Sequence, residues 1–251
     1  TCCEVAVLVV NKLLTEKHNK NLGLWRQLSQ DHAVKITGIV LLASILILIF
    51  LDVFVRMIYN VDQENVPYIY KLVSIGKDNS FPEVFNHSLL FLASVLFFAT
   101  SISKNSRVCF ALAGFMAIAW FDDSTQYHER FGWEFSKLFP NLNVGGLGSS
   151  HIGELLAWGT IGIVLLSLVF WASKNILDGD RNIIKMVYLP IFLMILCASL
   201  VDVVHSSLSG TKLDAVFMYL EDGGEMVATV MLALISLYVT RNENETFNDE
   251  V

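Results

Sequence analysis

The stretch ITGIVLLASILILIFLD, residues 36–52, contains sixteen uncharged residues before it reaches Asp52. An α-helix rises about 1.5 Å per residue and a bilayer core is about 30 Å thick, so a membrane span needs roughly 20 apolar residues. The hydrophobicity is continuous rather than alternating, which is typical of a membrane helix and not of a transmembrane strand. We therefore expect residues 36–57 to form a transmembrane helix.

Similar apolar runs recur along the chain, separated by short polar stretches. The chain has 251 residues, of which 54% are hydrophobic and 16% are charged, and its mean hydropathy is +0.56. A soluble domain would carry nearer a quarter charged residues. We expect an all-α polytopic helical bundle of about six transmembrane helices, with the further spans at 85–103, 108–129, 152–173, 183–205 and 215–240.

The polar ends of the chain flank this single membrane domain. Residues 1–33 mix basic and apolar residues and predict a cytoplasmic amphipathic segment on the membrane surface. Residues 34–241 form the transmembrane domain, and residues 242–251 form an acidic tail that we expect to be disordered. The net charge of −7 argues against nucleic acid as a partner.

The basic residues predict the orientation of the bundle. If the N-terminus is inside, eleven Lys and Arg residues fall on the inner side and six on the outer side. Because loops rich in Lys and Arg stay in the cytoplasm, we expect both termini to be cytoplasmic. A bacterial inner (plasma) membrane is the expected location.

Acidic residues interrupt four of the spans at a similar depth. The apolar runs 36–51, 108–121, 186–201 and 226–240 end at Asp52, Asp122, Asp202 and Glu225. Each run covers roughly 21–24 Å at helical rise, which places these acids roughly 6–9 Å below the outer boundary of the bilayer core. A charged, unpaired carboxylate at such a depth costs about 2–3 kcal/mol, so each acid needs a counter-charge, a proton, water or a metal.

Histidines lie beside several of these acids. Asp122 and Glu129 are seven residues apart, or two turns along one side of a helix, while Asp202 and His205 are three residues apart. Carboxylates and imidazoles from several helices are the ligands with which bundles bind iron, manganese or zinc. We expect a shared polar site, with a divalent transition metal, formed by Asp122, Asp123, His128, Glu129, Asp202, His205, Glu221 and Glu225, with His151 and Glu154 as secondary candidates.

Two features qualify this expected site. Asp52 is set apart from it, because Arg56 lies one turn further along the same helix and can pair with it. Asp122 and Asp123 are adjacent and point about 100° apart around a helix, so the sequence leaves open which of them faces the bundle interior.

Two short motifs resemble those of uncharacterised bacterial multi-pass membrane proteins. In the first, Asp122-Asp123 follows an apolar run and is followed by His128-Glu129. In the second, residues 220–226 read Leu-Glu-Asp-Gly-Gly-Glu-Met in the last helix. The resemblance covers two of the six spans. It implies the membrane architecture and these candidate residues, but no activity.

Three classes of function fit these observations. The first is a metal-dependent membrane hydrolase or oxidase that acts on a membrane-borne substrate, with its catalytic residues unassigned. The second is a non-catalytic accessory subunit of a larger membrane protein complex. The third is a proton or cation pathway, although the inner halves of the spans contain few ionisable groups.

Overall fold

The structure is a computed structural model that describes residues 24–59, 67–144, 147–174, 176–201, 204–205, 208 and 213–248. Within these residues, six helices are long and apolar enough to cross a membrane. They lie in α3 (His32–Tyr59), α5 (Phe81–Ser103), α6 (Arg107–Thr125), α8 (Ser149–Ser173), α9 (Asp178–Ile195, the candidate span continuing to Ala198) and α11 (Asp214–Asn248). The expected number and approximate positions of the spans are thereby confirmed.

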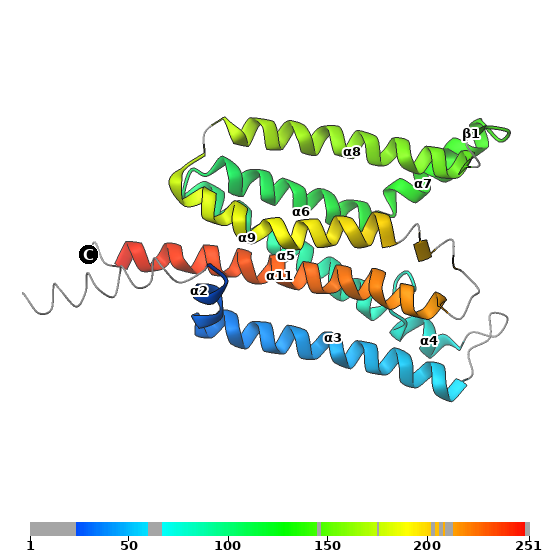
Figure 1. Cartoon of the computed structure of the whole chain (residues 1–251), viewed down its shortest axis with the longest axis horizontal. Helices are drawn as coiled ribbons and strands as arrows, with labels where there is room; N and C mark the ends of the chain where they lie inside the picture. Colours follow the sequence, from blue (N-terminus) through cyan, green and yellow to red (C-terminus); the bar gives the residue numbers. More distant parts are fainter. Residues whose placement is uncertain are drawn as a thin grey trace, which may run out of the picture.

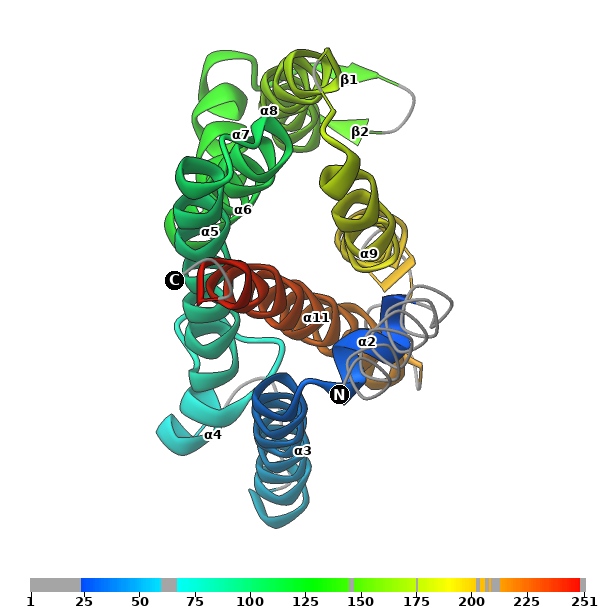
Figure 2. The same ribbon diagram turned by 90° about the vertical axis from the view of Figure 1, so that its left-hand side faces the viewer.

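The six long helices form an elongated bundle. Helix α3 lies at one edge and α8 at the other (Figure 1). In the end-on view α11 lies at the centre (Figure 2), where it packs against α3, α5 and α9. Helix α6 packs against both α5 and α8 and so joins the far edge to the centre.

The short elements lie at the two ends of this bundle. Helix α2 (Leu24–Gln30) precedes α3 at one end, which we call the α2 end. The opposite end, which we call the α7 end, contains α4 (Tyr68–Val73), α7 (Tyr127–Leu138) and the hairpin of β1 (Asn143–Val144) and β2 (Leu147–Gly148). The ion pair between Arg241 and Asp31, 3.4 Å long, places the start of α3 and the last turns of α11 together at the α2 end.

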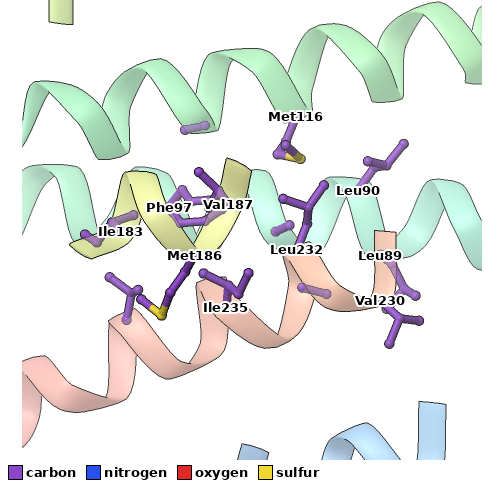
Figure 3. Packing of buried hydrophobic residues seen from close by; sticks show 14 of the residues in the cluster. Leu89, Leu90, Phe97, Met116, Ile183, Met186, Val187, Val230, Leu232 and Ile235 are labelled. Carbon is purple, nitrogen blue, oxygen red and sulfur yellow. The ribbon is translucent and has the colours of Figure 1, made fainter. Parts of the chain in front are cut away.

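The interior between α5, α6, α9 and α11 is mostly apolar. Phe97, Met116, Leu232 and Ile235 are fully buried there (Figure 3). Lipid tails are as apolar as these side chains, so close van der Waals packing rather than the hydrophobic effect holds such helices together. A polar link, between the Thr100 and Thr240 hydroxyls at 2.9 Å, joins α5 to α11 toward the α2 end.

Capping side chains set where the spans begin. Asp31 accepts hydrogen bonds from the backbone N–H groups of Ala33 and Val34, and Ser106 accepts one from Cys109. These bonds satisfy donors that a helix start leaves without a partner. Ser106 also donates its hydroxyl hydrogen to the buried Asp180 carboxylate at 2.7 Å, which ties the start of α6 to the start of α9.

The structure corrects the expected course of three segments. The third span does not continue as one helix to residue 129, because Gln126 takes a left-handed conformation (φ 50°, ψ 43°) and α7 begins anew. The fifth contains Pro190 and changes at its end into the π-helix η1 (Leu196–Val201). Helix α11 continues to Asn248, so the first part of the acidic tail is helical.

Helix α7 packs closely on the start of α8 through two glycines. A Cβ atom built at Gly153 would lie 2.8 Å from the Cα atom of Gly132 and 2.7 Å from the Cβ atom of Phe135. Neither contact can be relieved by turning a flexible side-chain end. The missing side chains therefore set the distance between these two helices.

Substitution of Gly153 tests this packing. We expect Gly153→Ala to lower the free energy of unfolding by about 1–3 kcal/mol, because the added methyl group must push α7 away from α8. Gly159 lies on the same helix with no atom within 4 Å of an added Cβ. Gly159→Ala should be neutral or slightly stabilising, and thermal unfolding in detergent compares the two variants. Equal stability of both variants would contradict the packing described.

Candidate functional site

The break between α6 and α7 brings Asp122 and His128 together. Asp122 is 1% exposed and lies in the last turns of α6. Its Oδ1 accepts the backbone N–H of His128 at 3.1 Å, and its Oδ2 accepts the ring Nδ1–H at 2.9 Å. One carboxylate thus caps the start of α7 and also fixes the orientation of the imidazole. Asp122, rather than the half-buried Asp123, is the acid that faces the interior.

Other groups surround the His128 ring. The indole of Trp158, on α8, lies with its ring centre 5.1 Å from that of the imidazole. Oε1 of Glu129 lies 4.0 Å from Nε2. Glu83, at the start of α5, is close enough to interact electrostatically with Glu129 and Asp123. His128 therefore has Asp122 on one nitrogen, Glu129 near the other, and an aromatic ring beside it.

The surroundings raise the pKa of both His128 and Glu129. Burial lowers the pKa of His128, but the hydrogen bond and the negative charge of Asp122 outweigh it, so the pKa is raised. Burial raises the pKa of Glu129, and the positive charge of His128 offsets part of this rise. Both groups thus hold a proton more readily than they would in water.

A second group of polar residues forms where α11 begins. The Nδ1 atom of His205 lies 2.6 Å from the Glu221 carboxylate, and its Nε2 atom lies 3.0 Å from Asp214. Burial lowers the pKa of His205, but the two carboxylates raise it overall. With an acid on each nitrogen, the imidazolium form is the better partner for both.

Close helix contact explains one glycine near Glu225. A Cβ atom at Gly224 would clash with the thiol sulfur of Cys197 on η1. The same atom at Gly223 would meet nothing within 4 Å. Only Gly224 is therefore explained by the approach of the two helices. Glu225, the next residue, is partly buried and interacts electrostatically with the Cys197 thiol.

A third polar group surrounds Asp52, which is 0% exposed. The predicted pairing with Arg56 is confirmed, because the Arg56 Nε atom lies 3.0 Å from Asp52 Oδ2. The hydroxyl of Tyr219 donates to the same oxygen. The Arg56 guanidinium lies 4.9 Å from the ring centre of Tyr70 and 3.0 Å from the sulfur of Met218. α3, α4 and α11 are thus tied together inside the membrane domain.

The structure thus distributes the predicted site residues over different groups. Asp122, Asp123, His128 and Glu129 lie together, while His205 and Glu221 form a separate pair with Asp214. In the described part of the chain, no three His, Cys, Asp or Glu side chains converge as ready-made metal ligands. Asp202 lies outside the described residues. The secondary candidates divide as well, since Glu154 accepts a hydrogen bond from Ser150 near α7 and His151 is exposed.

Three residues of these polar groups, Glu83, Trp158 and Tyr219, are not among the candidates that the sequence predicts. Trp158 and Tyr219 lie within the apolar fourth and sixth spans, where the sequence gives them no distinguishing signal. Glu83 has a local signature, since Ser80 accepts from the Glu83 backbone N–H and the Glu83 carboxylate accepts from Asn79, as in a capping motif. No short-range pattern marks the contacts of Trp158 or Tyr219, because both join helices that are distant in sequence.

Comparison with known proteins places the chain in a family. The model of the family described as "Domain of unknown function (DUF8692)" matches residues 33–240, and the chain belongs to that family. The match covers the whole six-span domain and leaves out the N-terminal segment and the tail. No curated protein and no solved structure matches the chain.

The Asp122–His128 contact can be tested by titration. We expect Asp122→Asn to lower the pKa of His128, because the ring loses its negatively charged hydrogen-bond partner. Asp123→Asn is the matched control, since it makes the same acid-to-amide change one residue away without touching a hydrogen bond to the ring. NMR of labelled histidine, assigned with His128→Gln, measures the pKa. A larger shift in the control would contradict this geometry.

The His205 contacts predict how stability depends on pH. The folded-state pKa of His205 is raised above its usual value of 6.5, so its stabilising effect is fully present below about pH 6.5. The effect is lost as the pH rises through the raised folded-state pKa. We expect His205→Gln to remove this part of the pH dependence, by up to about 1 kcal/mol because the groups are partly exposed. Thermal unfolding between pH 5.5 and 9 measures it, with the exposed His32→Gln as control. An unchanged profile in His205→Gln would show that these contacts contribute no stability.

Proposed function

We propose that this protein is a multi-pass membrane protein whose α7 end binds a divalent transition metal beside His128 and uses it on a membrane-borne substrate. The observation that carries the proposal is the fixed imidazole. Asp122 uses both of its carboxylate oxygens on His128, which leaves the ring Nε2 directed toward Glu129. A carboxylate behind a histidine is the usual support of a metal-binding imidazole, because it fixes the tautomer and raises the basicity of the other nitrogen.

The distances are compatible with one ion between the two side chains. Zinc binds imidazole nitrogen and carboxylate oxygen at about 2.0–2.2 Å in tetrahedral geometry, so two ligand atoms of one ion are about 3.4 Å apart. Nε2 of His128 and Oε1 of Glu129 are 4.0 Å apart, so the Glu129 side chain, which is 56% exposed, has to move by about half an ångström to share an ion with His128. Glu83 is near enough to Glu129 to interact with it electrostatically, but its carboxylate accepts a hydrogen bond from the Asn79 backbone, so the proposal assigns only His128 and Glu129 as ligands.

The remaining coordination positions would hold water, as in catalytic metal sites. Zinc or manganese would there activate water as a Lewis acid for a hydrolase, whereas iron or manganese would suit an oxidase. The site lies where α6 reaches the membrane boundary, so an amphiphile within the bilayer has direct access to it. Within the proposal, both ends of the chain are cytoplasmic and the site faces outward across a bacterial inner membrane.

An accessory subunit of a larger membrane complex is the second candidate. The edge helix α8 favours an accessory role, because only 11% of the most apolar stretch of this helix is buried inside the protein. That face is covered either by lipid or by a neighbouring membrane protein, and co-purification in mild detergent distinguishes them. A proton or cation pathway has less support, because the core cluster around Phe97, Met116 and Ile235 is apolar.

Elemental analysis tests the metal directly. Purified without chelator or metal-affinity resin, the wild-type protein should contain about one transition-metal ion per chain. His128→Ala and Glu129→Gln should each lose most of this metal, because each removes a ligand. His205→Ala should retain it, because His205 belongs to the separate group with Glu221 and Asp214.

Two results would overturn the proposal. One is a wild-type protein that takes up neither zinc, manganese nor ferrous iron on reconstitution. The other is a metal content that falls in His205→Ala but not in His128→Ala, which would place the ion at the start of α11. Thermal unfolding of each variant separates the loss of metal from the loss of fold.

A further inference from the structure

A groove of about 360 Å³ lies at the outside of the bend between α6 and α7. Its lining residues are Phe121, Thr125, Tyr127, Arg130, Phe131 and Glu134. Phe121 is 51% exposed, whereas the adjacent Asp122 is 1% exposed, so the groove lies on the side of α6 that faces away from the bundle interior. It is therefore distinct from the face that Asp122 and His128 share.

The groove combines aromatic walls with a cation. The ring centres of Phe121 and Tyr127 are 6.3 Å apart, and those of Tyr127 and Phe131 are 6.2 Å apart. This series crosses the bend and continues to Phe135 and Phe139. Such a wall offers apolar contact without long flexible side chains.

Arg130 is the cation of the groove. In the part of the chain that the structure describes, its guanidinium makes no hydrogen bond and no ion pair. Glu134 also lines the groove, but it is paired with Lys137 at 2.9 Å. Lys137 is further held 3.1 Å from the ring centre of Trp133. The two neighbouring cations of α7 thus differ. Lys137 is engaged by Glu134 and Trp133, whereas the guanidinium N–H groups of Arg130 are available to a ligand.

The length of α6 sets the depth of the groove in the membrane. Helix α6 has 19 residues and spans about 28 Å at helical rise, which nearly equals the thickness of a bilayer core. If Arg107 lies at the boundary of the α2 end, Thr125 lies at the opposite hydrocarbon boundary. Arg130, in the first turns of α7, then lies in the headgroup layer, where lipid phosphates are found.

We propose that this groove binds a glycerophospholipid of the adjacent leaflet. The phosphodiester accepts hydrogen bonds from the Arg130 guanidinium, whose planar fork suits phosphate. The glycerol backbone packs on Tyr127 and Phe131, and the acyl chains descend along Phe121 within the bilayer. The volume is in the range of small-ligand sites and matches a headgroup with its glycerol, not a whole lipid. The inference is independent of any metal at His128.

The test is lipid binding to the delipidated full chain in detergent, followed by native mass spectrometry. The probes are a short-chain phosphatidylglycerol, the diacylglycerol with the same chains, and inorganic phosphate. Phosphatidylglycerol should bind more tightly than either of the other two, because the groove recognises the phosphate and the apolar part together. Arg130→Gln should weaken phosphatidylglycerol binding about tenfold or more, as expected for loss of a charged hydrogen bond.

Two variants sharpen the test. Lys71→Gln removes the same charge from the same end of the bundle, at an exposed position on α4 outside the groove, so binding should stay within about twofold of wild type. Thr125→Trp leaves Arg130 in place but fills the groove, and it should weaken binding as much as Arg130→Gln does. Size-exclusion chromatography and thermal unfolding verify that each variant is folded.

Three outcomes would overturn the proposal. Equal weakening in Arg130→Gln and Lys71→Gln would mean non-specific attraction to the basic residues at this end of the bundle. Equally tight binding of diacylglycerol would exclude phosphate recognition, and equally tight binding of inorganic phosphate would show an anion site rather than a lipid site. Metal content is a separate readout, so failure of the metal proposal would leave this test unaffected.

Discussion

A carboxylate inside a membrane domain must find a partner, and this requirement accounts for much of the architecture. Asp52 is fully buried on α3, and its Oδ2 atom is shared by Arg56 and Tyr219. Because Tyr219 belongs to α11, the partner of the buried acid also fixes the packing of the first span on the last. The other oxygen, Oδ1, has no hydrogen-bond partner among the described residues, so the network is held by one half of the carboxylate.

The same requirement is met differently on α6. Among the described residues Asp122 pairs with no arginine and instead accepts from the backbone and the ring of His128. Both bonds need α7 to begin immediately after α6, and the left-handed Gln126 supplies that geometry. In a straight helix Asp122 and His128 would be six residues, or one and two-thirds turns, apart. Their side chains would then point to different sides of the helix. The break is therefore what brings the acid and the imidazole into contact, and the capping bonds in turn stabilise the break.

The sequence predicts the spans well, because each depends on a local property that the residues themselves carry. A run of apolar residues matched to the bilayer thickness favours a helix, and the six candidate helices agree with the expected spans except at the ends of the third and fifth. The Asp52–Arg56 pair is predictable for the same reason, since i, i+4 neighbours share a helix face.

The sequence does not predict which acids and histidines meet in one site. Similar depth brings acids to one plane, but the angle around each helix and the order of helices in the bundle decide which of them meet. His205 and Glu221 are close because α11 follows that segment, whereas His128 lies beside Trp158 because α7 packs against α8.

The two faces of the α6–α7 bend have different chemistry, and helix geometry keeps them apart. His128 and Arg130 are two residues apart on α7, so they point about 200° apart around its axis. A lipid phosphate held at Arg130 is therefore on the opposite side of the helix from the Asp122–His128 pair, and the groove is not a position from which that lipid could react at His128.

The effect of the bound lipid would be mechanical. A bound lipid would hold α7 at the level of the headgroups, while the glycine contact with α8 holds it laterally. The orientation of His128 depends on where α7 starts, so fixing this helix from two directions keeps the imidazole in contact with the buried carboxylate.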